Sequence, residues 1–283
     1  MIHKITKSEF DKYVDYIYAI SSDLSRSAFP IYADGVKTKE FFYTKSKKGL
    51  TQTGEEILLY DQGGSVQGWI HYYFIESDKY LGLSSMLIKS DFGKALSELF
   101  QYWRERFGEY SWCFYLPSDN VEGLDFMKKN GFSAASRDTV DVLLFKDYIP
   151  GRKYENVIPI SSGNFELFGN IHRRYDEEMY WTCDRIKNDL DRWRIFAYIE
   201  KGKCLGALYY VCAGKDLEIF GIDYAEEQYA PDVTEALLIS GLNAAKAEGA
   251  QSMYFFNDDM TRTIAEKVGF RRITEAFCFE GVI

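Results

Sequence analysis

Hydrophobic and polar positions follow two rhythms in the first half of the chain, one typical of strands and one typical of helices. Aromatic and β-branched residues fill 55–62, 65–77 and 80–88, which predicts three strands, at least two of them joined as a hairpin. Residues 92–110 carry apolar side chains three and four positions apart, which predicts an amphipathic helix. Those side chains are Leu96, Leu99, Phe100 and Trp103. A strand over 110–116, a helix over 120–131 and a strand over 138–145 complete this half.

The second half repeats this order after a stretch with Pro150, Gly151 and Pro159, which is the best candidate for a linker. Residues 163–190 are predicted to be helical, and three strands are predicted after them. The remaining elements are then a helix over 232–249, a strand over 251–256, a helix over 261–269 and a strand over 276–282.

Two spacings coincide between the halves and indicate a duplication. The interval from Ala95 to Gly108 is 13 residues, and so is the interval from Ala236 to Gly249. Each interval is followed by a strand, a helix and a Gly-Phe pair. A chain of 283 residues is long enough for two domains. We therefore expect an α+β fold with a mixed sheet in two tandem copies, over 1–148 and 153–283.

Charge and composition narrow the classes of partner. The net charge is −9 and the pI is about 5.1, which argues against nucleic-acid binding and against anionic membranes and permits a cationic acceptor such as an amine. No apolar run is long enough to span a membrane, and no apolar stretch follows Met1, so a cytoplasmic protein is expected. The five cysteines are scattered without a CxxC pair, and the three histidines are dispersed. We expect a reducing compartment, no disulfide framework and no metal site.

The repeated order of elements resembles the GNAT superfamily of N-acetyltransferases, over essentially the whole chain. In the first half, the residues that match the motif of this superfamily are Asn120, Gly123, Phe126, Gly131 and Phe132. In the second half, only Gly269 and Phe270 match, with Asn257 or Asp258 near the position of the asparagine. Each Gly-Phe glycine is also a natural helix terminator, because glycine adopts the left-handed conformation without strain.

The resemblance implies that an acyl-CoA lies between the fourth and fifth strands, with its pyrophosphate at the start of the third helix. The phosphate turn of the first half aligns in two ways. Either Gly93 is the final glycine, with Asp91 and Ile88 at the earlier positions, or Ser90, Gly93 and Ala95 fill the pattern. The cofactor-binding residues implied are Leu87, Ile88, Gly93, Lys94, Ala95 and Asn120.

The corresponding turn in the second half departs from the pattern, because Asp232 and Thr234 stand where glycines are usual. Asp232 and Glu235 have the spacing of a capping box, which would satisfy the free N–H groups of the helix and repel a pyrophosphate. The first half is therefore the expected site of the cofactor.

The catalytic positions also depart from the superfamily. Its usual general acid is a tyrosine four residues before the Gly-Phe glycine, and Met127 and Ala265 stand there instead. Tyr115, at the end of a strand, is the candidate substitute. A base is often an acid on the fourth strand; the second half offers Glu218 and Asp223, and Glu218 is the residue we select. The candidate base, Glu218, and the candidate cofactor site therefore lie in different halves of the chain.

Two functions agree with this pattern. The first is an acyltransferase that moves an acetyl or other acyl group from a CoA thioester to an amine of a small molecule or peptide, by direct attack. Acetyl-CoA or another acyl-CoA would be the cosubstrate, without a metal, and the protein would be a monomer or a homodimer. The second is a catalytically inactive binding or sensor module of the same fold.

Overall fold

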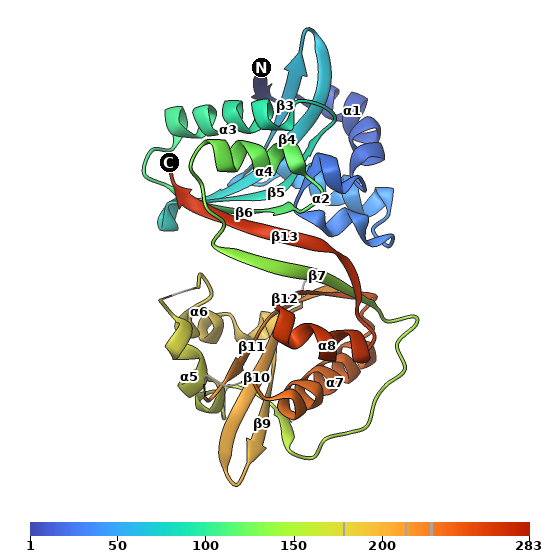
Figure 1. Ribbon diagram of the computed structural model, residues 1–283, viewed down its shortest axis with the longest axis vertical. Helices are drawn as coiled ribbons and strands as arrows, with labels where there is room; N and C mark the ends of the chain where they lie inside the picture. Colours follow the sequence, from blue (N-terminus) through green and yellow to red (C-terminus); the bar gives the residue numbers. More distant parts are fainter. Residues whose placement is uncertain (178, 213, 227–228) are drawn as a thin grey trace. The chain divides into compact units, whose positions relative to one another are not determined.

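The computed structural model describes residues 1–177, 179–212, 214–226 and 229–283, apart from the side chains of 30 and 31. It divides into two compact units (Figure 1). Unit 1 consists of Met1–Asp138 and Ile273–Ile283, and unit 2 consists of Thr139–Arg272. Within each unit, the strands form a mixed sheet with helices on both faces.

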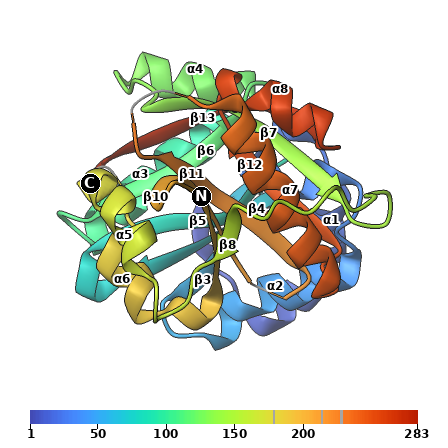
Figure 2. The same ribbon diagram turned by 90° about the horizontal axis from the view of Figure 1, so that it is seen from below.

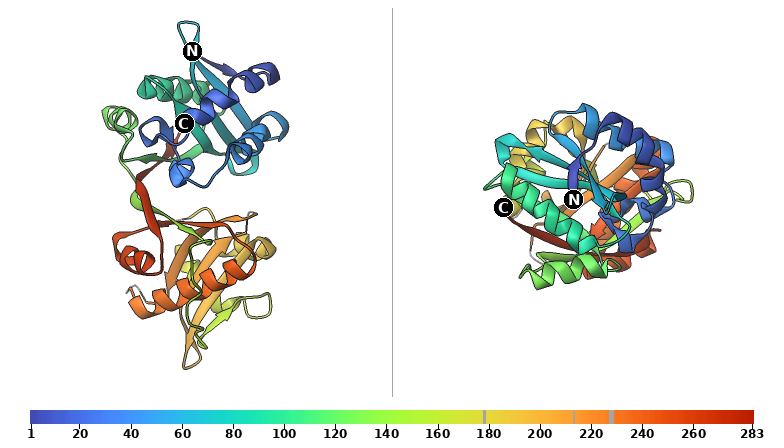
Figure 3. Two further views of the ribbon diagram at one scale, coloured as in Figure 1. Left: turned by 90° about the vertical axis from the view of Figure 1, so that its right-hand side faces the viewer. Right: turned by 90° about the horizontal axis from the view of Figure 1, so that it is seen from above.

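The sheet of unit 1 has the strand order β1-β3-β4-β5-β6-β13. Within it, β5 and β6 are parallel and the other neighbours are antiparallel. The strands are β1 (Ile2–Lys4), β3 (Glu55–Gln62), β4 (Ser65–Ile75), β5 (Tyr80–Ile88), β6 (Ser111–Pro117) and β13 (Arg271–Val282). Helices α1 (Lys7–Ile20) and α2 (Lys39–Thr51) cover one face, and α3 (Phe92–Arg106) and α4 (Val121–Lys129) cover the other (Figure 3).

Aromatic packing fills both faces of this sheet. On the α1–α2 face, the ring of Trp69 stacks between Phe10 and Phe42, at centroid distances of 5.6 and 5.4 Å. On the opposite face, the ring of Phe100 packs edge-on against Trp103 and Trp112. Such pairs contribute about 0.5–1.5 kcal/mol each beyond the area they bury.

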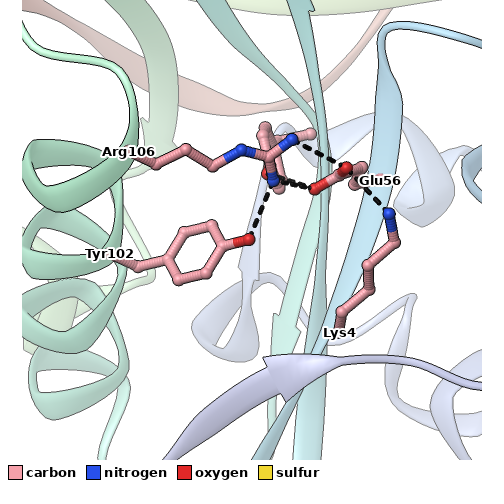
Figure 4. Close-up of polar contacts among 5 residues, drawn as sticks. Lys4, Glu56, Tyr102 and Arg106 are labelled. Atoms are coloured by element: carbon pink, nitrogen blue, oxygen red, sulfur yellow. Dashed lines mark hydrogen bonds and ion pairs between the residues drawn. The ribbon is translucent and has the colours of Figure 1, made fainter.

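A polar cluster around Glu56 ties helix α3 to the sheet of unit 1 (Figure 4). The Glu56 carboxylate accepts hydrogen bonds from Arg106 at the end of α3, from Lys4 Nζ at 2.9 Å and from the Tyr72 hydroxyl at 2.7 Å. Arg106 also donates to the Tyr102 hydroxyl at 2.8 Å. Burial opposes ionisation, but the bonds from Arg106, Tyr72 and Lys4 outweigh it and lower the pKa of Glu56 to about 2.

The sheet of unit 2 has the strand order β7-β12-β11-β10-β9-β8, again with one parallel pair, β11 and β12. Helices α5 (Glu166–His172) and α6 (Cys183–Asn188) lie on one face, and α7 (Pro231–Ala247) and α8 (Asp259–Lys267) on the other (Figure 2). The strands are β7 (Ser136–Leu144), β8 (Val157–Pro159), β9 (Trp193–Glu200), β10 (Lys203–Val211), β11 (Asp216–Tyr224) and β12 (Ser252–Asn257).

The two halves of the chain exchange their last strands. Strand β13, from the end of the chain, pairs with β6 in unit 1, from Ala276 opposite Pro117 to Val282 opposite Ser111. Most of β7, from the middle of the chain, pairs with β12 in unit 2. The compact units therefore differ from the expected ranges 1–148 and 153–283. Sequence order carries no information on this exchange, because backbone hydrogen bonds accept any strand of suitable length and pattern.

The helical pattern predicted over 163–190 is wrong in its middle. Two short helices, α5 and α6, form at its ends, separated by a 3₁₀ turn and irregular backbone. Side chains replace the helical hydrogen bonds there: Asp176 accepts from the N–H of Cys183 at 2.7 Å, and His172 contacts the carbonyl of Trp181 at 2.8 Å. These tertiary contacts outweigh the local helical preference.

Candidate functional site

Both sheets come apart at the same step of their topology. In unit 1, the parallel pairing of β5 and β6 ends at Gly82 and Cys113. In unit 2, the pairing of β11 and β12 ends at Ile219 and Phe255. We call the unpaired continuations of these strands the unit 1 splay and the unit 2 splay. The first strand of each parallel pair, β5 or β11, carries a β-bulge just after the last paired residue. The bulge leaves one residue of that strand outside its antiparallel ladder.

A segment of the chain itself occupies the unit 1 splay. Strand β2 (Ser27–Ala28) pairs with Leu87 and Met86 of β5, and the N–H of Phe29 donates to the carbonyl of Tyr115 on β6 at 3.2 Å. The Asn120 side chain, fully buried, donates from Nδ2 to the carbonyl of Ser27 at 3.0 Å. Residues Ser27–Phe29 therefore join β5 to β6 across the splay, as an added strand would.

The start of helix α3 in unit 1 is satisfied by a carboxylate. The N–H of Phe92 donates to Glu122 of α4 at 2.7 Å, and the residue before the helix, Asp91, brings a second carboxylate. Negative charge at a helix N-terminus is favourable for the helix and unfavourable for a bound anion. The helix start nearest the unit 1 splay is thus a poor phosphate site.

The residues predicted to bind the cofactor lie around this filled splay. Leu87 faces Ser27 in the strand ladder, Asn120 holds the carbonyl of Ser27, and a side chain on Gly93 would press on Phe126. Ile88 pairs with Gly68, Ala95 is fully buried and Lys94 is exposed. A cofactor site in unit 1 stays a prediction, and the pairing of residues Ser27–Phe29 argues against it.

The unit 2 splay differs. Among the described residues, no segment pairs with β11 beyond Ile219 on the side of β12. Helix α7 begins with Pro231 after Ala230, and Ala230 makes no side-chain cap. The capping box predicted from Asp232 and Glu235 is therefore wrong: Asp232 is the second residue of the helix, and Glu235 pairs with Lys267 instead. Proline is favoured at a first helical position, so the helix starts earlier than the acidic pattern indicates.

A buried polar cluster lies beside the end of β11. His172 Nδ1 is 2.7 Å from a carboxylate oxygen of Asp223, and its Nε2 is 2.8 Å from the carbonyl of Trp181. Since both ring nitrogens face acceptors, the imidazolium form is favoured. Burial opposes the charge, but the hydrogen bond and charge of Asp223 outweigh it and raise the pKa of His172. Burial raises the pKa of Asp223, and the contact with His172 opposes this.

Aromatic side chains surround the bulge of β11 on the same face. Phe220, the bulged residue, is 39% exposed, and its ring lies 5.2 Å from Trp193 and 6.4 Å from Trp181. The carbonyl of Trp181 is the one that His172 contacts, so Trp181 joins the buried ion pair to this aromatic group. No sequence pattern predicted that these side chains lie together, because they come from α5, β9, β11 and the stretch before α6.

Hydroxyl groups also lie at this end of β11, where the chain leads toward α7. The Tyr224 hydroxyl is 2.5 Å from Oγ1 of Thr234, and the rings of Tyr224 and Tyr229 meet edge to face. Burial raises the pKa of Tyr224 and of Tyr229. Neither tyrosine was among the predicted site residues, and the signal that could have found them is their place just before α7.

The two predicted catalytic residues fall in different units. Glu218 lies in the paired part of β11, opposite Tyr254, and is half-buried. Tyr115 lies on β6 of unit 1, where its carbonyl accepts from Phe29, and burial raises its pKa. Met127 and Ala265, at the positions of the usual acid, are both fully buried core residues. Roles for Glu218 and Tyr115 stay predictions.

A cavity of about 470 Å³ lies beside the start of α7. It is lined by Arg152, Lys153, Tyr154, Glu155, Asn156, Tyr198, Asp232 and Glu235. Arg152 is close enough to Glu235 and Asp232 for their charges to help raise its pKa, after the larger effect of Tyr154. The cations at this end of α7 therefore offset the acids of its first turn.

Solved structures match the fold of this chain over its whole length. A GCN5-related N-acetyltransferase from Sphaerobacter thermophilus is 11% identical, with a TM-score of 0.64, and the match covers 100% of this chain and 95% of that one. A tandem GNAT protein from the clavulanic acid biosynthesis pathway is 11% identical, with a TM-score of 0.58, and the match covers 100% and 98% of the two chains.

The chain has the fold of the GCN5-related N-acetyltransferases. The α+β fold with a mixed sheet, and the resemblance to GNAT proteins, are thereby confirmed. A putative acetyltransferase from Pyrococcus horikoshii is also similar, at 13% identity and a TM-score of 0.57, over 100% of this chain and 89% of that one. No protein-family model and no curated protein matches the sequence.

Two further findings concern the described residues alone. None of their helices is long and apolar enough to cross a membrane. Nowhere in this part of the chain do three or more His, Cys, Asp or Glu side chains gather as ligands for a metal ion.

Proposed function

We propose that this protein transfers an acyl group from a CoA thioester to an amine, and that unit 2 holds the thioester. The observation that carries the proposal is the contrast between the splays. Residues Ser27–Phe29 fill the unit 1 splay, whereas no described segment pairs with β11 beyond Ile219 on the β12 side in unit 2. An extended pantetheine arm needs such an open strand edge to hydrogen-bond to.

The charges around the first turns of α3 and α7 also support unit 2 as the site of the acyl-CoA. At α3, Glu122 and Asp91 place two carboxylates at the helix N-terminus. At α7, Ala230 offers no carboxylate at the cap and Pro231 has no N–H, so the backbone N–H groups of Asp232 and Val233 are the ones that would donate to a pyrophosphate. Arg152 and Lys153 add positive charge beside this turn and offset Asp232.

When bound, acyl-CoA would supply a thioester carbonyl that an amine can attack without a covalent enzyme intermediate. The chain would orient the reactants, which can account for much of such a rate enhancement. The bulge at Phe220 leaves backbone groups of β11 outside the ladder, where they can polarise a carbonyl. Glu218, on the same strand, is the proposed base, and Tyr224 offers a hydroxyl at the start of α7.

The acceptor would lie over Phe220 and Trp181, whose rings pack against the buried Trp193. Its amine would have to lose a proton before attack, and Glu218 projects from the face of β11 opposite to Leu217 and Ile219, which pack under α7 and α8. We therefore expect Glu218→Gln to lower the turnover rate by about 10²–10⁴-fold while acetyl-CoA binding is kept. Glu200→Gln, an exposed change at the end of β9, is the matched control.

A binding or sensor module is the second candidate. It is favoured by Met127 and Ala265, which place core residues where GNAT proteins usually carry a tyrosine acid. This alternative predicts stabilisation by acetyl-CoA without turnover. A ligand at about 100 times its Kd adds about 2.7 kcal/mol to the free energy of unfolding in either case. Release of free CoA in the presence of an amine panel separates the two.

The test of the site is calorimetric titration with acetyl-CoA of the wild type and two matched variants. Ala230→Asp puts a carboxylate at the cap of α7, where aspartate is a favoured residue, and thermal unfolding checks that this partly buried position accepts it. Lys94→Asp puts a carboxylate in the first turn of α3 at an exposed position. We expect one acetyl-CoA per chain, with binding lost in Ala230→Asp and kept in Lys94→Asp. The reverse pattern, or no binding to the wild type, would contradict the proposal.

A further inference from the structure

Two cysteines that are 165 positions apart in the sequence meet in unit 1. Cys113 lies on β6 and Cys278 on β13, and their sulfur atoms are 3.3 Å apart. The register places Cys278 opposite Tyr115 and Cys113 opposite Glu280, so the two thiols are diagonal neighbours on one face of the antiparallel pair. The exchange of the last strand is what brings them together.

The surroundings give the two thiols different characters. Cys113 is partly exposed, whereas Cys278 is buried. A hydrogen bond from Cys278 lowers the pKa of Cys113; burial and the charge of Glu280 oppose this, and a hydrogen bond from Tyr80 supports it. The contact with Cys113, together with burial, raises the pKa of Cys278. One thiol is therefore the more readily ionised and the more accessible, as in pairs of an attacking and a resolving cysteine.

The other cysteines lack this arrangement. Cys183 is buried beneath α5, where burial raises the pKa of its thiol. Cys204 and Cys212 are partly buried, and burial raises the pKa of both. All five cysteines are free thiols in the structure. The three outside the pair therefore serve as internal controls.

We propose that Cys113 and Cys278 are a peroxide-sensitive pair that closes into a disulfide between β6 and β13. The Cys113 thiolate attacks one oxygen of the peroxide, the O–O bond breaks, and Cys113 becomes a sulfenic acid as hydroxide or an alkoxide leaves. Cys278 then attacks the Cys113 sulfur, the S–S bond forms, and the hydroxyl group leaves as water after taking up the Cys278 proton. One peroxide accepts both electrons that the two thiols lose.

The disulfide would fasten the exchanged strand. The segment between Cys113 and Cys278 contains all of unit 2, so the bond would close a loop around that whole unit. It would also prevent β13 from leaving β6. Closure of so long a loop lowers the entropy of the unfolded chain, so the oxidised protein unfolds at a higher temperature. This inference concerns the thiols alone and stands apart from the acyl-transfer proposal.

The experiment treats the full chain with hydrogen peroxide and follows it in three ways. Free thiols under denaturing conditions should fall from five to three. Migration on a non-reducing denaturing gel should become faster, because the large closed loop compacts the chain, and dithiothreitol should reverse the change. Tryptic digestion should yield the peptides of Cys113 and Cys278 joined. The thermal midpoint should rise by about 5 °C on oxidation.

Matched variants decide whether this pair is responsible. Cys113→Ser and Cys278→Ala should each abolish the mobility change, while Cys212→Ser should keep it. Two variants are used because Cys278 is buried and its replacement by itself tests packing as well. The proposal is overturned if all five thiols persist under peroxide, if Cys113 is oxidised further without forming the bond, or if the joined peptides contain another cysteine.

Discussion

The two units share a sheet topology and lose strand pairing at the same step. They differ in what lies in the resulting opening between the two strands. In unit 1, Ser27–Phe29 hydrogen-bond across it, and Asn120 fixes the segment from the start of α4. In unit 2, the buried pair of His172 and Asp223 lies beside the opening, and no described segment pairs with β11 beyond Ile219 on the β12 side. A duplicated fold can thus keep its framework while one copy fills the opening between its strands with its own chain.

The starts of α3 and α7, which hold equivalent positions in the two units, are capped differently. Helix α3 begins beside two acids, one of which accepts the N–H of Phe92, whereas α7 begins with a proline and no side-chain cap. The first arrangement satisfies a backbone N–H from within the protein, and the second leaves the helix start without a side-chain cap. Stability and binding compete for the same backbone groups.

The largest expected effect is on the buried pair of unit 2. His172→Ala leaves the carboxylate of Asp223 buried without its cation, which should cost about 3–5 kcal/mol of unfolding free energy. Urea unfolding followed by the tryptophans of unit 2 measures this loss. His3→Ala, at a histidine that is exposed and pairs with Glu9, should change stability by less than about 1 kcal/mol.

The same pair predicts a pH dependence with a definite sign. Because the folded state raises the pKa of His172, its stabilising contribution is complete below the unfolded pKa near 6.5 and is lost as pH rises through the folded pKa. Unfolding curves between pH 6 and pH 10 should therefore show unit 2 weakening in the wild type. A flat profile across this range would show that the imidazolium is not the stable folded form.

A smaller effect tests the filled opening of unit 1. Asn120→Ala removes the cap on Gly123 and the bond to Ser27, and should cost about 1–3 kcal/mol. Asp258→Ala removes only the cap of α8 in unit 2, and should cost about 1 kcal/mol. Thermal unfolding of both variants gives the difference, which measures how strongly Asn120 holds the segment. Equal losses would mean that the Ser27 bond adds nothing.

The smallest expected effect is the loss of the stabilising contribution of Glu56 at low pH. Since the pKa of Glu56 is lowered to about 2 in the folded state, its contribution is present above pH 4.5 and is lost as pH falls toward 2. Glu56→Gln should cost about 1–2 kcal/mol at pH 7 and nearly nothing at pH 2. Hydrogen exchange at β3 and α3 localises the change to unit 1. A loss of equal size at both pH values would assign the effect to packing rather than charge.

The sequence predicted what depends on neighbouring residues. The spacing of Leu96, Leu99 and Trp103 predicted α3, and Gly131 ends α4 with a positive φ of 81°. Local preference failed at α7, where Pro231 set the start and Asp232 did not, and over 163–190, where contacts of His172 and Asp176 broke the helix. In each failure, a distant partner or a backbone constraint outweighed an acidic or periodic pattern.

By itself, the sequence determined the order of elements, the duplication and the resemblance to GNAT proteins, because periodicity and turn residues act within a few positions along the chain. Only the tertiary structure decided that β13 and β7 exchange units, that Ser27–Phe29 fill one opening, and that Cys113 meets Cys278. These pairings use backbone hydrogen bonds between distant segments. Backbone groups are the same at nearly every residue, so no pattern of side chains records which strand they will join.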